Sequence, residues 1–575
     1  MSGSLFQNKF VIRKILNNNS IFNSSPANSV VSAAFVITIA GLASRILGLF
    51  RDRLLASAFG AGDVMDVYYA AFKVPDLIYN VLILGALGAA FIPIFTGLIN
   101  EKNKEAAWEL ANGILNIMLL LLIIFSLIFA IFAPFVMKVI TPGFSPEKMD
   151  QVVSFSRIMF LSPVFLGLSG IFGGILTSFR KFLIYSIAPI MYNLGIIFGV
   201  LVLVRFWGPI GLAWGVVLGA SLHMLIQLPA AWHSGFRYKP IFKKAFFNPN
   251  IRKVFFLMIP RALGIAINQI NILVITIFAS TLAAGSLAVF SFAQNIQSVP
   301  LGIFGISFAI AVFPVLSTLA AKNKTQDFIE NFSTTFRQIL FFVVPLSIFL
   351  IVLRAQVVRV VLGSGKFDWS DTILTFQCLG VFAASLFAQS TIPLLARSFY
   401  ALQNTKTPFF IALIIESINI LLVFLLIGKY QVLGLAIAFS TTSIIQMFLL
   451  LFFLHFKLGN LNDKKIIKFL FKISIASVLA GGLIQLLKNY LVNDISISLF
   501  GQKILRIVSP SIDLDTFLGV FAQLSISGLF GLGAFIALCW LLRLEEFFNF
   551  KDSLARKLFK GKKVIVENTT EVSGI

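Results

Sequence analysis

The sequence predicts an all-α polytopic membrane protein with fourteen transmembrane helices. We expect two six-helix lobes, related by a pseudo-twofold axis along the membrane normal, followed by two C-terminal helices. The 575 residues are 58% hydrophobic and 12% charged, with a mean hydropathy of +0.95, and a soluble chain could not bury so much apolar surface. Apolar stretches recur in runs of about 20 residues, the length that crosses about 30 Å of hydrocarbon. A β-barrel would instead show short alternating strands.

The predicted spans follow one another with mostly short connections. The first series lies at residues 31–57, 66–96, 107–137, 151–178, 183–205 and 209–232. The second series lies at residues 254–283, 286–320, 329–352, 372–400, 407–428 and 431–456, and two further spans lie at 465–487 and 514–542. Several exceed the minimum length, so these helices are expected to tilt or to extend into water.

Basic residues are concentrated in alternate connections, as in Lys243-Lys244 and Lys562-Lys563. The positive-inside rule therefore places both termini in the cytoplasm. The N-terminal segment does not resemble a cleavable signal peptide. The expected division is a cytoplasmic tail at 1–30, an N-lobe at 31–233, a basic cytoplasmic linker at 234–253, a C-lobe at 254–456, two helices at 457–542 and a basic cytoplasmic tail at 543–575.

Short motifs of the first series recur in order in the second, which predicts an internal duplication. The paired motifs are Ala90-Phe91-Ile92-Pro93 with Ala311-Val312-Phe313-Pro314, Ser178-Phe179 with Ser398-Phe399, Asn193 with Asn419, and Gly211-Leu212-Ala213 with Gly434-Leu435-Ala436. Each unit holds an even number of spans, so both copies point the same way across the membrane. A transport site is then expected at the interface between the lobes.

Charged side chains lie inside the first two predicted spans. Arg45 and Asp52 are seven residues apart, so a helix places them on one face, with Arg51 about 120° away. Asp66 and Lys73 repeat this spacing. Charge facing hydrocarbon is costly, so these faces are expected to line a polar cavity. The alternative is that Arg51-Asp52-Arg53 and Asp66 mark the outer ends of adjacent helices at the membrane interface.

Arg261 stands in the seventh span within a motif like the one around Arg45. Its alternative is an arginine that reaches back to the inner interface. Guanidinium groups that converge on one cavity would suit a phosphate or pyrophosphate, whose oxygens they bind in pairs. Lys73 would add a mobile point charge.

Glu416 and Asn419 are helical neighbours in the eleventh span. With Thr441 or Thr442 they could offer oxygens to a cation, although hydrogen bonding between helices is the simpler interpretation. No resident metal or cofactor is predicted.

No catalytic arrangement stands out. The three histidines are scattered, no Gly-rich phosphate loop is present, and Cys378 and Cys539 are too few for a disulfide framework or a metal cluster. Basic residues at span ends also argue against nucleic-acid binding. The sequence therefore predicts a transporter and not an enzyme, driven by the membrane potential or a monovalent cation gradient.

Long ordered motifs resemble the MurJ (MviN) lipid II flippase family, which belongs to the multidrug/oligosaccharidyl-lipid/polysaccharide exporter superfamily. They are Ser44–Asp52, Phe59–Gly62, Ala71–Pro75, Ala90–Pro93, Thr141–Phe144, Gly365–Phe367 and Ser398–Pro408. The resemblance covers about residues 30–456 well and the last two spans by position only.

This resemblance implies a function. Such a protein flips lipid II, the undecaprenyl-pyrophosphate-linked disaccharide-pentapeptide, outward across a bacterial cytoplasmic (inner) membrane. The helices at 457–542 would form a groove for the lipid tail, with membrane lipids as neighbours and proteins of cell-wall synthesis left open as partners. Carried over by position, the cavity residues are Arg45, Arg51, Asp52, Asp66 and Lys73.

Some positions depart from the family pattern. Tyr79 and Asn80 stand where many relatives have basic residues, and Asn295 stands in the eighth span where they often have arginine. Asn295 is therefore included in the substrate-binding set. Either Arg261 supplies the second-lobe charge instead, or the chemistry of the substrate differs.

The sequence is also compatible with other functions. A flippase for another polyprenyl-pyrophosphate glycan, or a cation-coupled drug exporter of the same fold, is the nearest alternative. A polytopic glycosyltransferase would need an essential acidic residue in a sizeable outward loop, such as the one at 488–513. A signalling scaffold would use the basic C-terminal tail.

Overall fold

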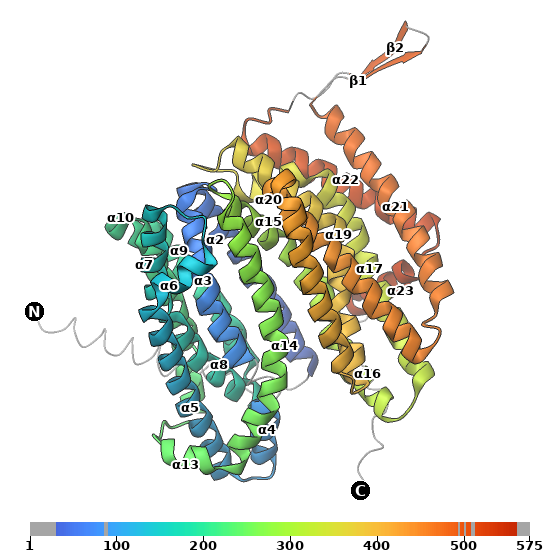
Figure 1. The fold of residues 1–575 in the computed structure, drawn as a ribbon. Coiled ribbons are helices and arrows are strands. Elements are labelled where there is room, and N and C mark those ends of the chain that lie inside the picture. Colours follow the sequence, from blue (N-terminus) through green and yellow to red (C-terminus); the bar gives the residue numbers. More distant parts are fainter. Residues whose placement is uncertain (1–29, 85–89, 493–494, 500–501, 508–511, 560–575) are drawn as a thin grey trace, which may run out of the picture. The chain divides into compact units, whose positions relative to one another are not determined.

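The computed structural model describes residues 30–84, 90–492, 495–499, 502–507 and 512–559. Regular structure in these residues is almost entirely helical, which confirms the predicted all-α membrane class (Figure 1). Residues 1–29 of the predicted N-terminal tail and residues 560–575 of the predicted C-terminal tail lie outside the described residues.

The helices of the first half are short or interrupted at several places. They are α2 (Val30–Phe59), α3 (Asp63–Tyr79), η1 (Asn80–Leu84), α4 (Ile92–Asn100), α5 (Lys104–Ile131), α6 (Ala133–Ile140), α7 (Pro146–Met159), α8 (Ser162–Ser178), α9 (Phe182–Phe198), η3 (Gly199–Leu203), α10 (Val204–Trp207), η4 (Gly208–Ile210), α11 (Gly211–Leu225), α12 (Leu228–His233) and α13 (Phe242–Phe247).

The second half contains longer helices and one pair of strands. These elements are α14 (Pro249–Ser280), α15 (Ser286–Pro300), η5 (Leu301–Ile306), α16 (Ser307–Ala321), α17 (Thr325–Val352), α18 (Arg354–Leu362), α19 (Trp369–Ala401), α20 (Lys406–Leu458), α21 (Asp463–Tyr490), β1 (Ile495–Leu499), β2 (Gln502–Ile507), α22 (Phe517–Leu541) and α23 (Glu545–Phe559).

Ten helical stretches in the described residues are long and apolar enough to cross a membrane. Two of them, Phe182–His233 and Lys406–Leu458, each cover two of the predicted spans. The chain breaks inside both, because Gly208 has φ 65° and ψ −156° and Gln431 has φ 52° and ψ −133°. The first two predicted spans fall outside the ten, and the first of these, α2, carries four charged residues. The count of fourteen spans stays a prediction.

The backbone repeats itself at the helix ends. Residues with positive φ occur in five ordered pairs that are 221 to 225 residues apart: Gly60 with Gly285, Lys102 with Asn323, Arg180 with Gln403, Gly208 with Gln431, and Gly235 with Gly459. Left-handed residues commonly terminate helices, so these pairs mark equivalent turns. The second and eighth predicted spans also share a π-helical turn, η1 in one and η5 in the other. The backbone thus follows the same order of repeats as the sequence motifs.

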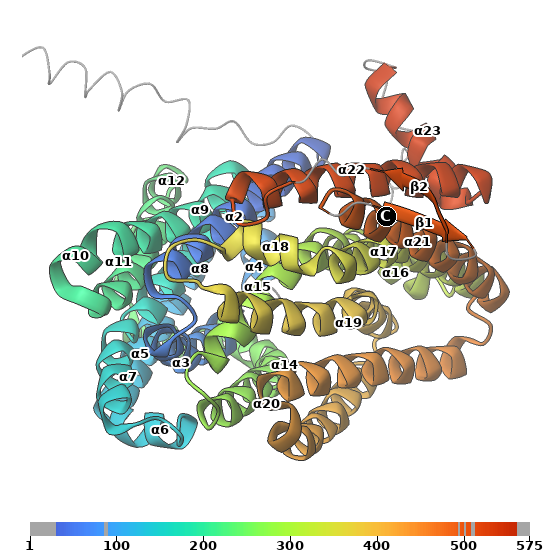
Figure 2. The same cartoon turned by 90° about the horizontal axis from the view of Figure 1, so that it is seen from above.

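The chain forms two compact units. The first contains the chain up to Val299 together with Val358–Phe382 and Phe409–Thr442, and the second contains the remainder. In the first unit α9 packs between α2 and α11 (Figure 2). A Cβ atom on Gly195 would lie 2.3 Å from the Gly219 backbone, so only glycine allows this approach of α9 to α11. This packing fixes the helix that carries Asn193 beside α2.

In the second unit α21 and α22 pack together, and α21 also packs on α17. A Cβ atom on Gly531 of α22 would lie 2.2 Å from the Ile484 side chain of α21. Near the end of α21, Gln523 Nε2 donates to the Lys488 carbonyl (2.9 Å), and Gln356 Nε2 donates to Gln523 Oε1 (2.9 Å). These are the helices predicted at 457–542, and their role as a lipid-tail groove stays a prediction.

A two-stranded antiparallel hairpin is the one departure from the all-α class in the described residues. Strands β1 and β2 pair Ile495 with Ile507 and Ile497 with Leu505 (Figure 1). They lie in the long connection predicted at 488–513. The alternation of Ile and Ser in β1 has the two-residue period of a strand, a signal too short to separate from a loop in the sequence alone.

Candidate functional site

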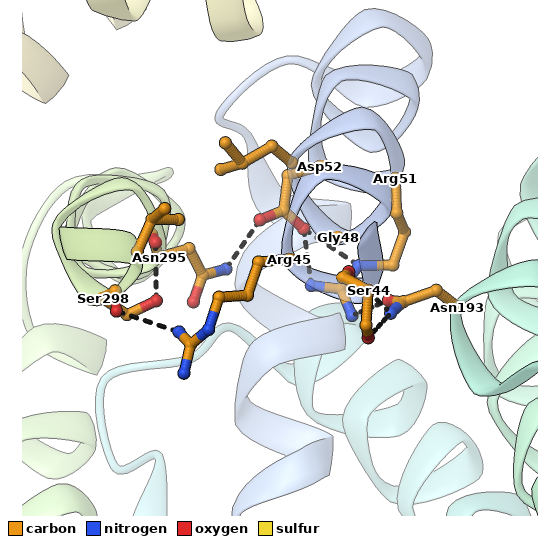
Figure 3. A pocket seen from close by; sticks show the side chains of 10 residues that line it. Ser44, Arg45, Gly48, Arg51, Asp52, Asn193, Asn295 and Ser298 are labelled. Atoms are coloured by element: carbon orange, nitrogen blue, oxygen red, sulfur yellow. Dashed lines mark hydrogen bonds and ion pairs between the residues drawn. The ribbon is translucent and has the colours of Figure 1, made fainter. Parts of the chain in front are cut away.

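A polar pocket of about 200 Å³ opens in the first unit between α2, α9 and α15 (Figure 3). Its lining residues are Ser44, Arg45, Gly48, Leu49, Arg51, Asp52, Asn193, Asn295, Ser298 and Val299. Four of the seven residues predicted to bind substrate therefore lie beside one cavity: Arg45, Arg51, Asp52 and Asn295.

Arg51 is held by two partners. Its Nε and Nη2 atoms lie 3.0 and 2.7 Å from Asp52 Oδ1, and its Nη1 donates to Asn193 Oδ1 at 3.1 Å. The side chains are 20% and 3% exposed for Arg51 and Asp52 respectively. A buried carboxylate of this kind needs a charged partner, and Arg51 supplies it. The positive charge of Arg51 is therefore neutralised locally in this conformation.

Asp52 also connects two helices. Its second oxygen, Oδ2, accepts a hydrogen bond of 2.9 Å from Asn295 Nδ2 on α15. Asn295 thus contacts the acidic member of the pair, and the polar amide suits that contact because it can donate to a carboxylate. Both carboxylate oxygens of Asp52 are consequently occupied by protein groups.

Arg45 lies on the same helix but in a different environment. Its Nη1 donates to the Ser298 carbonyl at 3.0 Å, and its side chain is half-buried (Figure 3). Among the described residues, no carboxylate lies within 4.0 Å of this guanidinium. Arg45 is therefore a cation whose charge is not neutralised by an ion pair in the described part of the chain.

Asn193 completes the wall of the pocket. Its Nδ2 lies 3.3 Å from the Ser44 carbonyl, 3.4 Å from Ser44 Oγ and 3.1 Å from the Pro189 carbonyl. The amide thus joins α9 to α2 while its oxygen orients Arg51. The sequence did carry a signal for it, since a lone Asn in an apolar span recurs as Asn419 in the repeat.

Asp66 lies outside this pocket and stabilises a helix end. Its Oδ2 and Oδ1 accept the backbone N–H groups of Gly285 (2.8 Å) and Ala288 (2.9 Å), at the N-terminus of α15. Lys148 Nζ contacts Asp66 at 2.8 Å and Asp63 at 2.7 Å. A carboxylate at this position satisfies unpaired N–H groups and complements the helix dipole. The alternative interpretation of Asp66, a residue at a helix end, fits these contacts.

Contacts also involve the two glycine-containing motifs Phe59–Gly62 and Gly365–Phe367. The Ala61 N–H donates to Asp371 Oδ2 (2.9 Å), and the Lys366 N–H donates to the Ser57 carbonyl (2.9 Å). Gly285 has φ 87°, and a Cβ atom there would lie 1.7 Å from the Ala61 carbonyl oxygen. The turn at 60–62 therefore approaches the turn at 281–285 through its backbone and is bonded to the Asp371 side chain, while Lys366 is bonded to the end of α2 at Ser57.

Lys73 and Asp76 form a separate polar group on α3. Both are partly exposed, and Asp76 lies within electrostatic range of Lys73, Tyr79 and Tyr192. Lys73 was predicted from the sequence, and Asp76 was not. The available signal was the spacing of three residues, which puts both side chains on one helix face.

The remaining predicted residues lie on α14 and α20. The Arg261 side chain lies outside the described residues. Asn271 hydrogen-bonds the Glu416 carboxyl, and Asn419 Nδ2 donates to Thr442 Oγ1 at 3.0 Å. Three buried oxygens, Asn271 Oδ1, Glu416 Oε2 and Asn419 Oδ1, have no hydrogen-bond partner. No cluster of three or more His, Cys, Asp or Glu occurs in the part of the chain that the structure describes.

Comparisons with known proteins point in one direction. A sequence model described as "Lipid II flippase MurJ" matches residues 55–503. The chain is 30% identical over 537 residues to the "Probable lipid II flippase MurJ" of Buchnera aphidicola subsp. Schizaphis graminum, covering 92% of this chain and 100% of that protein. It is also 30% identical over 434 residues to the protein of the same name from Rhizobium tropici, covering 72% and 80%.

Solved structures share the fold. The structure titled "Lipid II flippase MurJ, inward closed conformation" aligns with a TM-score of 0.71 at 24% identity, covering 90% of this chain and all of that one. An inward-facing multidrug resistance MATE family transporter of the MOP superfamily aligns with a TM-score of 0.63 at 14% identity, covering 73% and 96%.

Proposed function

The chain belongs to the MurJ lipid II flippase family, and from this premise we propose that it carries lipid II from the inner to the outer leaflet of a membrane. The observation that carries the proposal is Arg45, a half-buried arginine beside a polar pocket inside a multi-pass membrane protein. Arginine in such a place is costly unless it serves a polar pathway. Its planar fork matches the oxygens of a pyrophosphate.

Arg51 would bind the cargo only in competition with its protein partners. Its guanidinium is held by Asp52 and Asn193, so an entering anion must compete with a carboxylate for it. Asn295 holds the other oxygen of Asp52, and a shift of α15 would loosen that contact. Cargo binding and movement of α15 are therefore coupled through Asp52, as alternating access requires.

The contacts of Asp66 with α15 would close the opposite end of the pathway. Both hydrogen bonds from the α15 N-terminus end on this single carboxylate. With the N-terminus in the cytoplasm, these turns face outward. Release of lipid II on the outer side would then need Asp66 to part from Gly285 and Ala288.

The energy source we propose is a monovalent cation gradient or the membrane potential. The three unpartnered oxygens of Asn271, Glu416 and Asn419 are the kind of ligand that a hard cation takes. Transport faster with sodium than with choline would support this site, provided that Asn419→Leu abolishes the difference. Equal rates in both salts would exclude it.

Transport of this kind changes the position of the cargo and no covalent bond. We place the protein in the bacterial cytoplasmic (inner) membrane, with both termini in the cytoplasm and with lipids as neighbours. The family membership also leads us to propose proteins of cell-wall synthesis as partners. We do not propose nucleic acid as a partner.

Depletion of the protein in its own cell tests the function. We expect lipid II to accumulate in the inner leaflet, where an externally added lipid II-cleaving enzyme cannot reach it. Accumulation of another polyprenyl-pyrophosphate glycan there, with lipid II unchanged, would instead identify a different cargo. A drug exporter of the same fold would leave both lipids unchanged.

A further inference from the structure

Lys73 and Asp76 present opposite charges on one face of α3. They are three residues apart, so their side chains lie next to each other along the helix. Between them Val74 and Pro75 are buried, while Lys73 and Asp76 are partly exposed. Charges that face hydrocarbon are strongly disfavoured, so we expect this face of α3 to line a polar space.

Neither charged group is committed to a protein partner. Among the described residues, no side-chain hydrogen bond and no ion pair within 4.0 Å involves Lys73 or Asp76. The buried carboxylates Asp52 and Asp66 differ, since each accepts hydrogen bonds at both of its oxygens. Lys73 and Asp76 therefore keep their capacity to bind an external group.

Tyrosine residues lie near Asp76. Tyr79 follows it by three residues on the same face of α3, and Tyr68 and Tyr192 lie within electrostatic range of both Asp76 and Arg51. The Lys73–Asp76 pair lies on α3, the helix that follows α2 and packs against it, and α2 carries Arg45 and Arg51 of the pocket.

We propose that Lys73 and Asp76 recognise a zwitterionic α-amino-carboxylate group on the peptide part of the cargo. The ammonium would donate to Asp76, the carboxylate would accept from Lys73, and the Tyr79 and Tyr192 hydroxyls would supply further hydrogen bonds. A group with both charges on one carbon matches two opposite charges on adjacent positions of one helix face. This inference rests on the proposed function, because it assigns the peptide end of the same cargo.

The test uses the full-length protein in proteoliposomes and two forms of lipid II. One carries meso-diaminopimelate in its stem peptide, with an ammonium and a carboxylate on the terminal carbon. The other carries lysine, with the ammonium alone. We expect the wild-type protein to move the first form roughly tenfold faster at limiting concentration, the size of one charge-assisted hydrogen bond.

Asp76→Asn and Lys73→Gln should each reduce this ratio toward one. The matched control is Asp327→Asn, because Lys324 and Asp327 have the same spacing on an exposed surface, with side chains 59% and 54% exposed. The control should keep the wild-type ratio. If one variant fails to fold, the other variant and the wild-type ratio still decide the outcome.

Equal rates for both forms in the wild-type protein would overturn this inference and leave the flippase function standing. A ratio that persists in both variants would also overturn it. If the protein transported neither form of lipid II, that result would instead contradict the proposed function itself.

Discussion

The Arg51–Asp52 contact sets the charge of the pocket before any cargo arrives. Asp52→Asn would leave the guanidinium without its counter-ion, a loss of about 2–3 kcal/mol after allowance for the exposed fifth of the Arg51 side chain. The double variant Arg51→Gln/Asp52→Asn should be more stable than Asp52→Asn alone, because no uncompensated charge remains. Thermal unfolding of the four proteins in detergent forms the double-mutant cycle. Simple additivity of the two losses would contradict the pairing.

Asp368 provides a pH-dependent contribution outside the membrane. Its Oδ1 accepts the Asp371 N–H and the Ser370 hydroxyl, and these hydrogen bonds lower the pKa of the Asp368 carboxyl. A lowered folded-state pKa stabilises the protein above the unfolded value, about 3.9, and this contribution is lost as the pH falls through the folded value. Asp368→Ala should therefore lower the melting temperature at pH 7 and lose that effect below about pH 4. A difference that persists unchanged at pH 3 would contradict this assignment.

Among whole elements, α15 depends on a carboxylate from another helix. Asp66 is buried and takes two backbone N–H groups of α15, whereas Asp63 shares Lys148 but has a side chain 63% exposed. Asp66→Asn should cost about 1.5–3 kcal/mol, the range for hydrogen bonds to a charged group. The control Asp63→Asn should cost less than about 0.5 kcal/mol, as for other exposed pairs. Equal losses, measured by thermal unfolding, would mean that Lys148 and not α15 is the important partner.

The breaks in the two long helical stretches allow a test of the internal repeat. Gln431 adopts φ 52° and ψ −133°, a region almost restricted to glycine, and its counterpart in the first half is Gly208. Gln431 is exposed, so Gln431→Gly should stabilise the protein by about 1 kcal/mol, and Gly208→Gln should destabilise it by a similar amount. Chemical unfolding measures both changes in the free energy of unfolding. Destabilisation by Gln431→Gly would show that the side chain makes a compensating contact.

For the molecule as a whole, the sequence predicted the helices better than the contacts between them. Apolar run length and charge placement sufficed for the membrane class and for most span positions. Arg45 and Asp52 were predicted to line one cavity because a charged side chain inside an apolar span is costly unless it faces a polar space. Asn295 was included for a different reason, its position in the family pattern. The contact between Arg51 and Asp52 could not be predicted, since successive helical residues point about 100° apart.

Other contacts could not be predicted from the types of residue in the sequence. The partner of Arg45 is the Ser298 carbonyl, a backbone group that every residue carries. Asp66 was predicted to line a cavity or to mark a helix end, but its partners are backbone N–H groups more than 200 residues away, and only the tertiary fold brings them together. The hairpin of β1 and β2 was missed for a similar reason, because its pattern is short.

The central claim is that lipid II crosses the membrane along a pathway that needs the Arg45 guanidinium. The most direct measurement is the flipping rate of lipid II in proteoliposomes for the wild-type protein, Arg45→Ala and the control Arg205→Ala, whose side chain is exposed on α10. We predict that Arg45→Ala lowers the rate at limiting lipid II by roughly tenfold or more, as loss of a charge-assisted contact implies, while Arg205→Ala stays near the wild-type rate. Unimpaired flipping by Arg45→Ala would contradict the account.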